Sequence, residues 1–135
     1  MTAQSVEFPL VCQVCGTPGV AWKGQTLRRG ELRWEVDFQC ENCGLTSCDW
    51  DTGEAPTHIR EALLSAYGPA WLRVEEARDR VKALQVLRRT FGWSLEHARQ
   101  ALAGLASPGY ECTDVEAEFL RLELKELGVL AAVVK

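Results

Sequence analysis

The sequence predicts an α+β protein: an N-terminal antiparallel sheet, followed by a unit of order β-α-α-β-α-β. Two Cys-x-x-Cys-Gly turns, CQVCG at 12–16 and CENCG at 40–44, bracket a short segment. Within it, residues 31–39, ELRWEVDFQ, alternate strictly between apolar and polar side chains, which is the period of a half-buried strand. After residue 70, apolar residues recur instead at steps of three and four, which is the period of helices.

The two turns place Cys12, Cys15, Cys40 and Cys43 at the spacing of metal ligands. Two residues between cysteines allow one tight turn to direct both thiolates to a single ion, and the glycine that follows adopts backbone conformations other residues resist. The sequence therefore predicts one structural Zn²⁺ ion held by all four thiolates. Four thiolates leave no position for water, which argues against a catalytic metal. Cys48, five residues after Cys43, remains open as an alternative ligand.

Residues 1–55 are expected to form the first domain. A short strand at 8–11 leads into the first metal turn, Gly24 and Gly30 mark turns, and the strand at 31–39 leads into the second metal turn. This layout resembles a zinc ribbon over about residues 6–50. A ribbon of this size buries little apolar surface, so bound zinc is expected to contribute about 10 kcal/mol or more to its stability.

Residues 56–69 are expected to connect the two domains through one helix at 57–67. Gly68 and Pro69 then end the helix. Its expected buried stripe consists of Ile59, Leu63, Ala66 and Tyr67.

Residues 70–135 are expected to form the second domain. Ser94 is predicted to cap one helix, and Thr113 with Glu116 to form a capping box at the start of another. The expected elements are strand 71–74, helix 79–91, helix 94–103, strand 110–112, helix 113–127 and strand 129–134. The apolar residues that define the helices are Val81, Leu84, Leu87, Phe91, Leu95, Ala98, Leu102, Val115, Phe119, Leu122 and Leu127.

Two stretches of this domain, VKALQVLRRTFGWSLEHARQAL and VEAEFLRLELKELGVLAAVVK, carry a family resemblance. Residues 90–95 read TFGWSL between two helices, 98–99 read Ala-Arg within the second, and 127–129 read Leu-Gly-Val before the last strand. In this pattern, residues 70–135 resemble the C-terminal domain of the bacterial ribosomal stalk protein. The resemblance implies that domain's fold and its use as a protein-docking domain.

The resemblance also implies a surface on the first two helices that presents basic and apolar residues to translation factors. The residues of this chain at those positions are Arg80, Val81, Leu84, Arg88 and Arg99. Gln85 and Glu96 depart from the family, which has lysine there. Trp93, in the turn between the helices, is expected to anchor an interface if its indole is exposed.

Charge divides the chain into two unlike parts. Residues 78–99 contain six basic and two acidic residues, which favours a protein partner with an acidic surface. Residues 1–55 contain four basic and eight acidic residues, and a zinc ion with four thiolates adds two negative charges. This acidity argues against generic nucleic-acid binding, and the Arg28-Arg29 pair is the only local feature that favours it.

No enzyme signature is present, and neither an N-terminal export signal nor an apolar run long enough to span a membrane is found. The sequence therefore favours a cytoplasmic, non-enzymatic protein-interaction module with a dedicated protein partner. An immunity protein that neutralises a toxin is the specific form of this hypothesis. The alternatives are a translation-associated factor that binds the ribosome or translational GTPases, and a zinc-ribbon nucleic-acid-binding protein.

Overall fold

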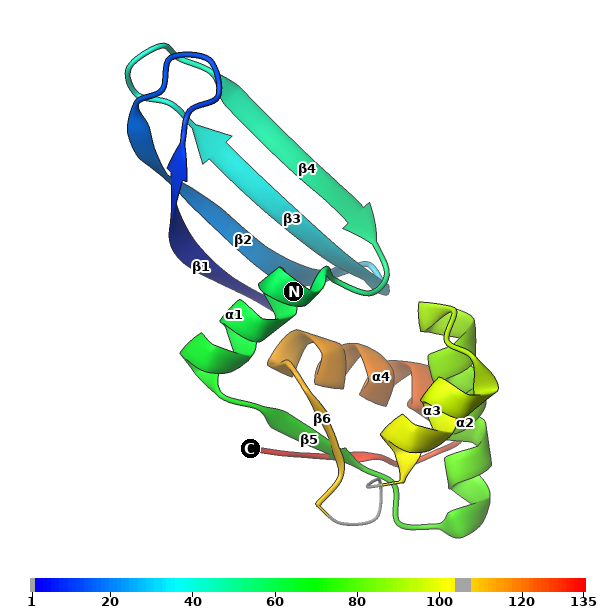
Figure 1. The fold of residues 1–135 in the computed structure, drawn as a ribbon. Helices are drawn as coiled ribbons and strands as arrows, with labels where there is room; N and C mark the ends of the chain where they lie inside the picture. The colour runs from blue at the N-terminus through cyan, green and yellow to red at the C-terminus, as the bar shows by residue number, and fades with distance from the viewer. Residues whose placement is uncertain (1, 104–107) are drawn as a thin grey trace. The chain divides into compact units, whose positions relative to one another are not determined.

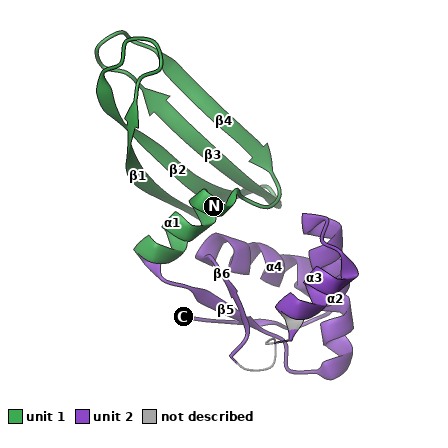
Figure 2. Cartoon of the chain, in the orientation of Figure 1, with its two compact units in different colours: residues 1–66 green, residues 67–135 purple. Residues whose placement is uncertain are grey.

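The computed structural model describes residues 2–103 and 108–135 and shows an α+β protein (Figure 1). The chain divides into two compact units, residues 1–66 and 67–135 (Figure 2). The first unit contains a four-stranded sheet and one helix, and the second contains a three-stranded sheet and three helices.

The sheet of the first unit is antiparallel throughout, with strands in the order β1-β2-β3-β4. The strands are β1 (Thr2–Val11), β2 (Pro18–Arg28), β3 (Glu31–Gln39) and β4 (Thr46–Thr52). β3 has the predicted bounds, whereas β1 is longer than the strand expected at 8–11. β4 was not predicted, because its sequence, TSCDWDT, has only two apolar residues, and every one of its residues is exposed.

Gly24 was expected in a turn, and this prediction is wrong. It lies in the middle of β2, paired with Ser5 in β1 and Glu35 in β3. A Cβ atom at this position would meet the carbonyl oxygen of Gln4 and come within 2.9 Å of the Cα of Ser5. Glycine is therefore explained by close backbone approach inside the sheet. Gly30 does lie in the β2–β3 turn, at φ +77°.

Helix α1 (Thr57–Tyr67) covers one face of this sheet. Ile59 and Leu63 are fully buried with Ala55, and they pack against three partly buried side chains of the sheet, Val6, Trp34 and Val36. The other two residues of the expected stripe, Ala66 and Tyr67, are exposed. The apolar cluster ends at Leu63, so the last turn of the helix has no buried cluster to join.

The second unit follows the predicted order β-α-α-β-α-β. Its elements are β5 (Ala70–Arg73), α2 (Ala77–Phe91), α3 (Leu95–Leu102), β6 (Tyr110–Cys112), α4 (Asp114–Glu126) and β7 (Ala132–Val134). The sheet is antiparallel, in the order β6-β5-β7. β7 is shorter than the expected strand 129–134. The buried Val129 lies between α4 and β7, and its N–H donates to the carbonyl of Leu124 in the last turn of α4 at 2.9 Å.

Both predicted helix caps are present. The Ser94 hydroxyl accepts a hydrogen bond from the His97 N–H at 3.0 Å at the start of α3. At the start of α4, Thr113 and Glu116 form the full capping box: each side chain accepts from the backbone N–H of the other residue, at 3.1 and 2.9 Å. These bonds satisfy donors that a helix start leaves unpaired.

α4 packs on β5 and β7, and α2 packs on α3 and α4. The helices contribute these fully buried side chains to the core: Ala83, Val86, Leu87, Ala98, Val115, Ala117, Phe119, Leu120 and Leu124. Four residues of the expected helical pattern are instead exposed: Val81, Leu95, Leu122 and Leu127. α4 has apolar residues on more than one side, and packing selected Leu120 and Leu124 over Leu122. The Leu102 side chain lies outside the described residues.

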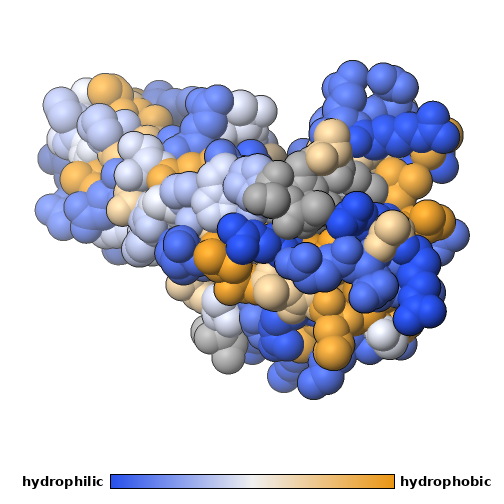
Figure 3. Space-filling view, turned by 90° about the horizontal axis from the view of Figure 1, so that it is seen from below, coloured by the Kyte–Doolittle hydropathy of each residue, from blue (hydrophilic) through white to orange (hydrophobic). Residues whose placement is uncertain are grey.

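The described residues contain no helix long and apolar enough to cross a membrane. On the face drawn in Figure 3, hydrophobic side chains lie interspersed among hydrophilic ones.

Candidate metal centre

Two turns of closely similar backbone geometry carry the four predicted ligands. In the β1–β2 turn the N–H of Gly16 donates to the carbonyl of Cys12 at 2.9 Å, and in the β3–β4 turn the N–H of Gly44 donates to that of Cys40 at 3.0 Å. Both glycines have positive φ, +73° and +78°, a conformation that other residues rarely adopt. The sequence CxxCG thus specifies each turn locally, and the antiparallel sheet brings both turns to the same end.

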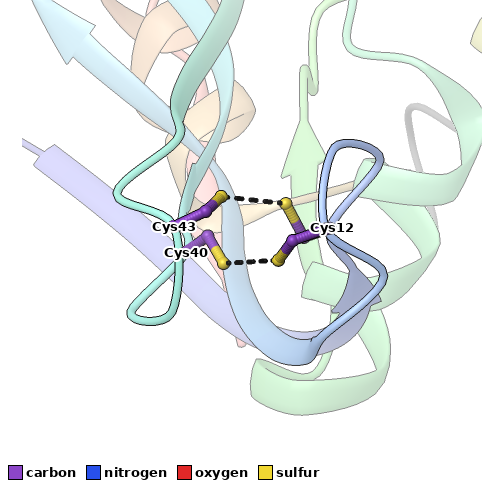
Figure 4. A group of neighbouring side chains, drawn as sticks. Cys12, Cys40 and Cys43 are labelled. Carbon is purple, nitrogen blue, oxygen red and sulfur yellow. Dashed lines mark hydrogen bonds between the residues drawn. The ribbon is translucent and has the colours of Figure 1, made fainter.

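The four sulfur atoms form one compact group (Figure 4). Sγ of Cys12 lies 3.7 Å from Sγ of Cys43, and Sγ of Cys15 lies 3.6 Å from Sγ of Cys40. All four sulfurs lie within 4.8 Å of one another. An ion that binds four thiolates tetrahedrally at about 2.3 Å requires sulfur separations of about 3.8 Å, whereas a disulfide requires about 2.05 Å. The spacing therefore fits a metal ion, and all four cysteines are free of disulfides.

Hydrogen bonds from the turns stabilise the ionised form of two ligands. Sγ of Cys15 lies 3.2 Å from Oγ1 of Thr17. Hydrogen bonds from the Thr17 side chain, the Asn42 side chain and the Thr17 backbone lower the pKa of Cys15 to about 5. The pKa of Cys12 is also lowered, chiefly by the backbone N–H of Cys15. Thr17 and Asn42 were not singled out in the sequence, although both stand within two residues of a ligand.

Cys43 differs from these two ligands. The Leu45 backbone N–H favours its thiolate, but removal from water and the neighbouring sulfurs outweigh that bond and raise the pKa of Cys43 to about 12. At neutral pH without metal, Cys43 therefore carries a proton that a bound cation would displace.

The centre is continuous with a small core at its end of the sheet. Cys12 and Cys40 are buried and form one cluster with Ala21 and Phe38, on which Phe8 and Leu45 pack. Cys15 and Cys43 are exposed. One cysteine of each pair thus belongs to the core, and a bound ion would tie both turns to it.

The remaining two cysteines lie elsewhere. Cys48 is on β4, where it pairs with Asp37 and is exposed, and it is not a member of the four-sulfur group. Cys112 in β6 is fully buried, and its thiol donates weakly to the carbonyl of Ala70 at 3.6 Å.

The six residues expected on the helical docking surface differ in their exposure. Val81 is 57% exposed, Arg88 and Arg99 are exposed, and Leu84 is half-buried. Arg80 is half-buried, and its guanidinium already donates hydrogen bonds within its own unit, to the carbonyls of Val74 at 3.0 Å and Glu75 at 2.9 Å.

Trp93 is half-buried within a group of aromatic side chains. Its ring is stacked on His97, with centroids 4.3 Å apart, and lies 5.1 Å from Phe91 and 6.0 Å from Tyr110. Its indole is thus partly covered by its own unit.

The fold and the site together define an α+β protein with a four-cysteine group that could hold a metal ion. No protein-family model, curated protein or solved structure matches the chain.

Proposed function

We propose that the chain is a non-enzymatic, zinc-stabilised protein-interaction module with one dedicated protein partner. The observation that supports the zinc ribbon is the group of four thiols. The sulfur of Cys12 in one turn lies 3.7 Å from that of Cys43 in the other, and the sulfurs of Cys15 and Cys40 lie 3.6 Å apart. Zinc is the ion best suited to tetrahedral coordination by four thiolates. Because protein ligands fill every position, the ion has a structural role.

Metal analysis of two matched variants tests the zinc assignment. We expect about one zinc per chain in the wild type, loss of that zinc in Cys40→Ser, and retention in Cys48→Ser. Both variants remove one thiol, so the comparison isolates the four-sulfur group. Equal zinc contents in the two variants would contradict the assignment.

A surface on α2 and α3 is the proposed contact for the partner. We define this helical surface by Val81, Leu84, Arg88 and Arg99. These two helices carry an exposed valine and exposed arginines, which combine an apolar contact with positive charge and suit a partner with an acidic surface. Arg80 is left out because its guanidinium holds the β5–α2 connection.

Affinity capture with the full chain tests this surface. The double variant Arg88→Glu/Arg99→Glu should weaken binding of the purified captured partner by at least about tenfold, because two attractions become repulsions. Lys125→Glu, an exposed charge reversal on α4, is the control and should retain binding. Equal affinity of the double variant and the wild type would exclude this surface as the contact.

An immunity protein is the specific form that we propose for this module. The chain is small and acidic, with 135 residues and a formal charge of −4, and it carries no recognised catalytic motif. The test is co-expression with the product of the adjacent gene, followed by calorimetry on the purified pair. A stable stoichiometric complex that suppresses the toxicity of that product is expected, and absence of binding would contradict the immunity role.

A translation-associated factor is the second candidate. The sequence pattern at 90–95 and the element order of residues 70–134 support it. In this case the wild type and Lys125→Glu should co-sediment with ribosomes or bind a translational GTPase, and Arg88→Glu/Arg99→Glu should not.

A further inference from the structure

The sheet of the first unit has a second face, which α1 does not cover. Side chains alternate between the two faces, and Val6, Trp34 and Val36 face α1. We call the opposite face the outer face. By strand register it carries Glu7, Val20, Trp22, Gly24, Thr26, Arg28, Glu31, Arg33, Glu35, Asp37, Cys48 and Trp50.

Two large aromatic side chains are exposed on the outer face: Trp22 at 42% and Trp50 at 51%. Trp22 pairs with Asp37 across β2 and β3, and Trp50 pairs with Glu35 across β3 and β4. Each tryptophan is therefore directly opposed to an acidic residue of the neighbouring strand, at a spacing of about 5 Å between Cβ atoms.

Trp50 already stacks a cation of its own chain. The guanidinium carbon of Arg33 lies 3.8 Å from the centre of the Trp50 ring, which is a cation–π contact. Among the described residues, no cation and no other aromatic ring makes such a contact with Trp22. On the outer face, the Trp50 indole is thus already stacked with a cation, Arg33. The Trp22 indole, which is opposed to Asp37, has no such cation among the described residues.

Hollows in the surface adjoin Trp22 on two sides. One, of about 310 Å³, is lined by Trp22, Asp37 and Cys48 among others. The other, of about 510 Å³, is lined by Trp22, Val20 and Glu41 among others. Trp22 therefore lines both hollows, and each hollow is also lined by one acidic residue, Asp37 in the first and Glu41 in the second.

The strand residues of the outer face include four acidic and two basic side chains, so this face has an excess of negative charge. In residues 2–103 and 108–135, neither Glu35 nor Asp37 forms an ion pair. A hydrogen bond with Asp37, burial and the charges of Asp37 and Glu35 raise the pKa of the Cys48 thiol. Cys48 therefore stays a neutral thiol at physiological pH and adds no further negative charge. Such a surface repels phosphate and attracts cations.

We propose that the outer face binds a basic peptide segment of a partner protein, with an arginine side chain stacked on Trp22 and paired with the carboxylate of Asp37. Arginine suits both contacts, because its planar guanidinium stacks on indole and donates two parallel hydrogen bonds to a carboxylate. Neighbouring basic residues of the segment reach Glu35 and Glu41. This surface is independent of the proposed helical surface. The helical surface suits an acidic partner surface, whereas the outer face suits a basic segment.

Fluorescence anisotropy with labelled peptides tests the proposal on the zinc-loaded full chain at about 0.15 M salt. The probes are a hexa-arginine peptide and a hexa-glutamate peptide. Saturable binding with a one-to-one stoichiometry is expected for hexa-arginine and none for hexa-glutamate. Absence of hexa-arginine binding would overturn the proposal.

Matched variants separate this site from general charge attraction. Asp37→Asn should weaken hexa-arginine binding by about tenfold, and Trp22→Leu by severalfold or more. Asp49→Asn removes the same charge from an exposed position whose register places it on the α1 side of the sheet, and it should stay within about twofold of the wild type. Equal effects of Asp37→Asn and Asp49→Asn would overturn the proposal. If Trp22→Leu fails to fold, Asp37→Asn still decides the result.

The carboxylates of Glu35 and Asp37 and the Cys48 thiol lie within 4.8 Å of one another, so metal binding is the competing use of this region. Zinc analysis after dialysis distinguishes the two. One zinc per chain in both wild type and Asp37→Asn is the expected result. A second zinc in the wild type that is lost in Asp37→Asn would show a metal site and overturn the peptide proposal.

Discussion

Two thiols with similar sequence contexts, Cys15 and Cys43, have different protonation behaviour. The pKa of Cys15 is lowered to about 5 by hydrogen bonds from Thr17 and Asn42, whereas that of Cys43 is raised to about 12 because removal from water and the neighbouring sulfurs disfavour its thiolate. At neutral pH without metal, Cys15 is a thiolate and Cys43 a thiol.

Zinc affinity should fall as the pH is lowered from about 8 to about 6, because protons compete with the ion for Cys43. Cys15 contributes little to this dependence, since its low pKa keeps it ionised throughout the range. Competition with a chromophoric chelator at each pH measures the affinity, and proton release on zinc addition gives the linked protons. Cys48→Ser should show the same pH dependence, and a pH-independent affinity would contradict this account.

Sequence spacing was sufficient to predict the four thiols as a group, because the two residues between the cysteines of each turn allow both thiolates to face one ion. It was not sufficient for Cys48. The direction of that side chain depends on the register of β4 against β3, which pairs Cys48 with Asp37 on the outer face. A register shift of one residue would reverse the face, and nothing local to Cys48 specifies the register.

Strand β2 contains Gly24, whose predicted position in a turn is wrong. Gly24 was expected in a turn, since glycine commonly marks one. In the structure the residue lies within the sheet, where β1 approaches too closely for a Cβ atom. The sequence around Gly24 contains no sign of that approach, which depends on a strand that begins more than twenty residues earlier.

Gly24→Ala should destabilise the zinc-loaded protein by about 1–3 kcal/mol, because the added methyl group meets the backbone of Gln4 and Ser5. Urea denaturation followed by tryptophan fluorescence measures the change. Thr26→Ala, two residues further along the same strand and on the same face, is the control and should cost less than about 1 kcal/mol. Unchanged stability of Gly24→Ala would show that β1 can move away without cost.

The start of α4 is an element boundary that sequence alone predicted correctly. Thr113 and Glu116 stand three residues apart and satisfy each other's backbone donors locally, so no tertiary contact is needed to recognise the motif. The structure adds that both residues are buried, where an unpaired donor is more costly than at the surface.

Thr113→Ala should therefore cost about 1–2 kcal/mol of unfolding free energy, more than Ser94→Ala at the exposed start of α3. Thermal or urea unfolding of both variants gives the comparison. Thr113→Ser keeps the hydroxyl and should restore most of the stability. A greater loss for Ser94→Ala than for Thr113→Ala would contradict the importance of burial at this cap.

At the scale of the whole molecule, the chain contains two compact units, each with its own core. The four-cysteine group lies entirely within residues 1–66, and the cluster on Cys12 and Cys40 contains only a few apolar side chains. The second unit contains no member of this group, and its buried residues come from all three of its helices and from its sheet.

Removal of zinc should consequently unfold the first unit and leave the second folded. Hydrogen exchange on the full chain, with and without a strong chelator, measures this residue by residue. We expect amides in residues 2–66 to lose protection and those in the second unit to keep it. Simultaneous loss of protection in both units would contradict independent stability.

The features that depend on local chemistry were predictable from the sequence: the two CxxCG turns, the alternation of β3, the caps of α3 and α4, and the order of the elements in the second unit. These follow from residues a few positions apart, whose backbone preferences act before any distant contact forms.

Three features depend on contacts between distant segments: which apolar residues are buried, why Gly24 is glycine, and which side chains share the outer face. Leu120 and Leu122 are equally apolar, yet only Leu120 is in the core, because α4 presents one side to β5, β7 and α2. Trp22 and Asp37 stand together through strand pairing across fifteen positions. Contacts of this kind depend on register and packing between distant segments, which no local pattern encodes.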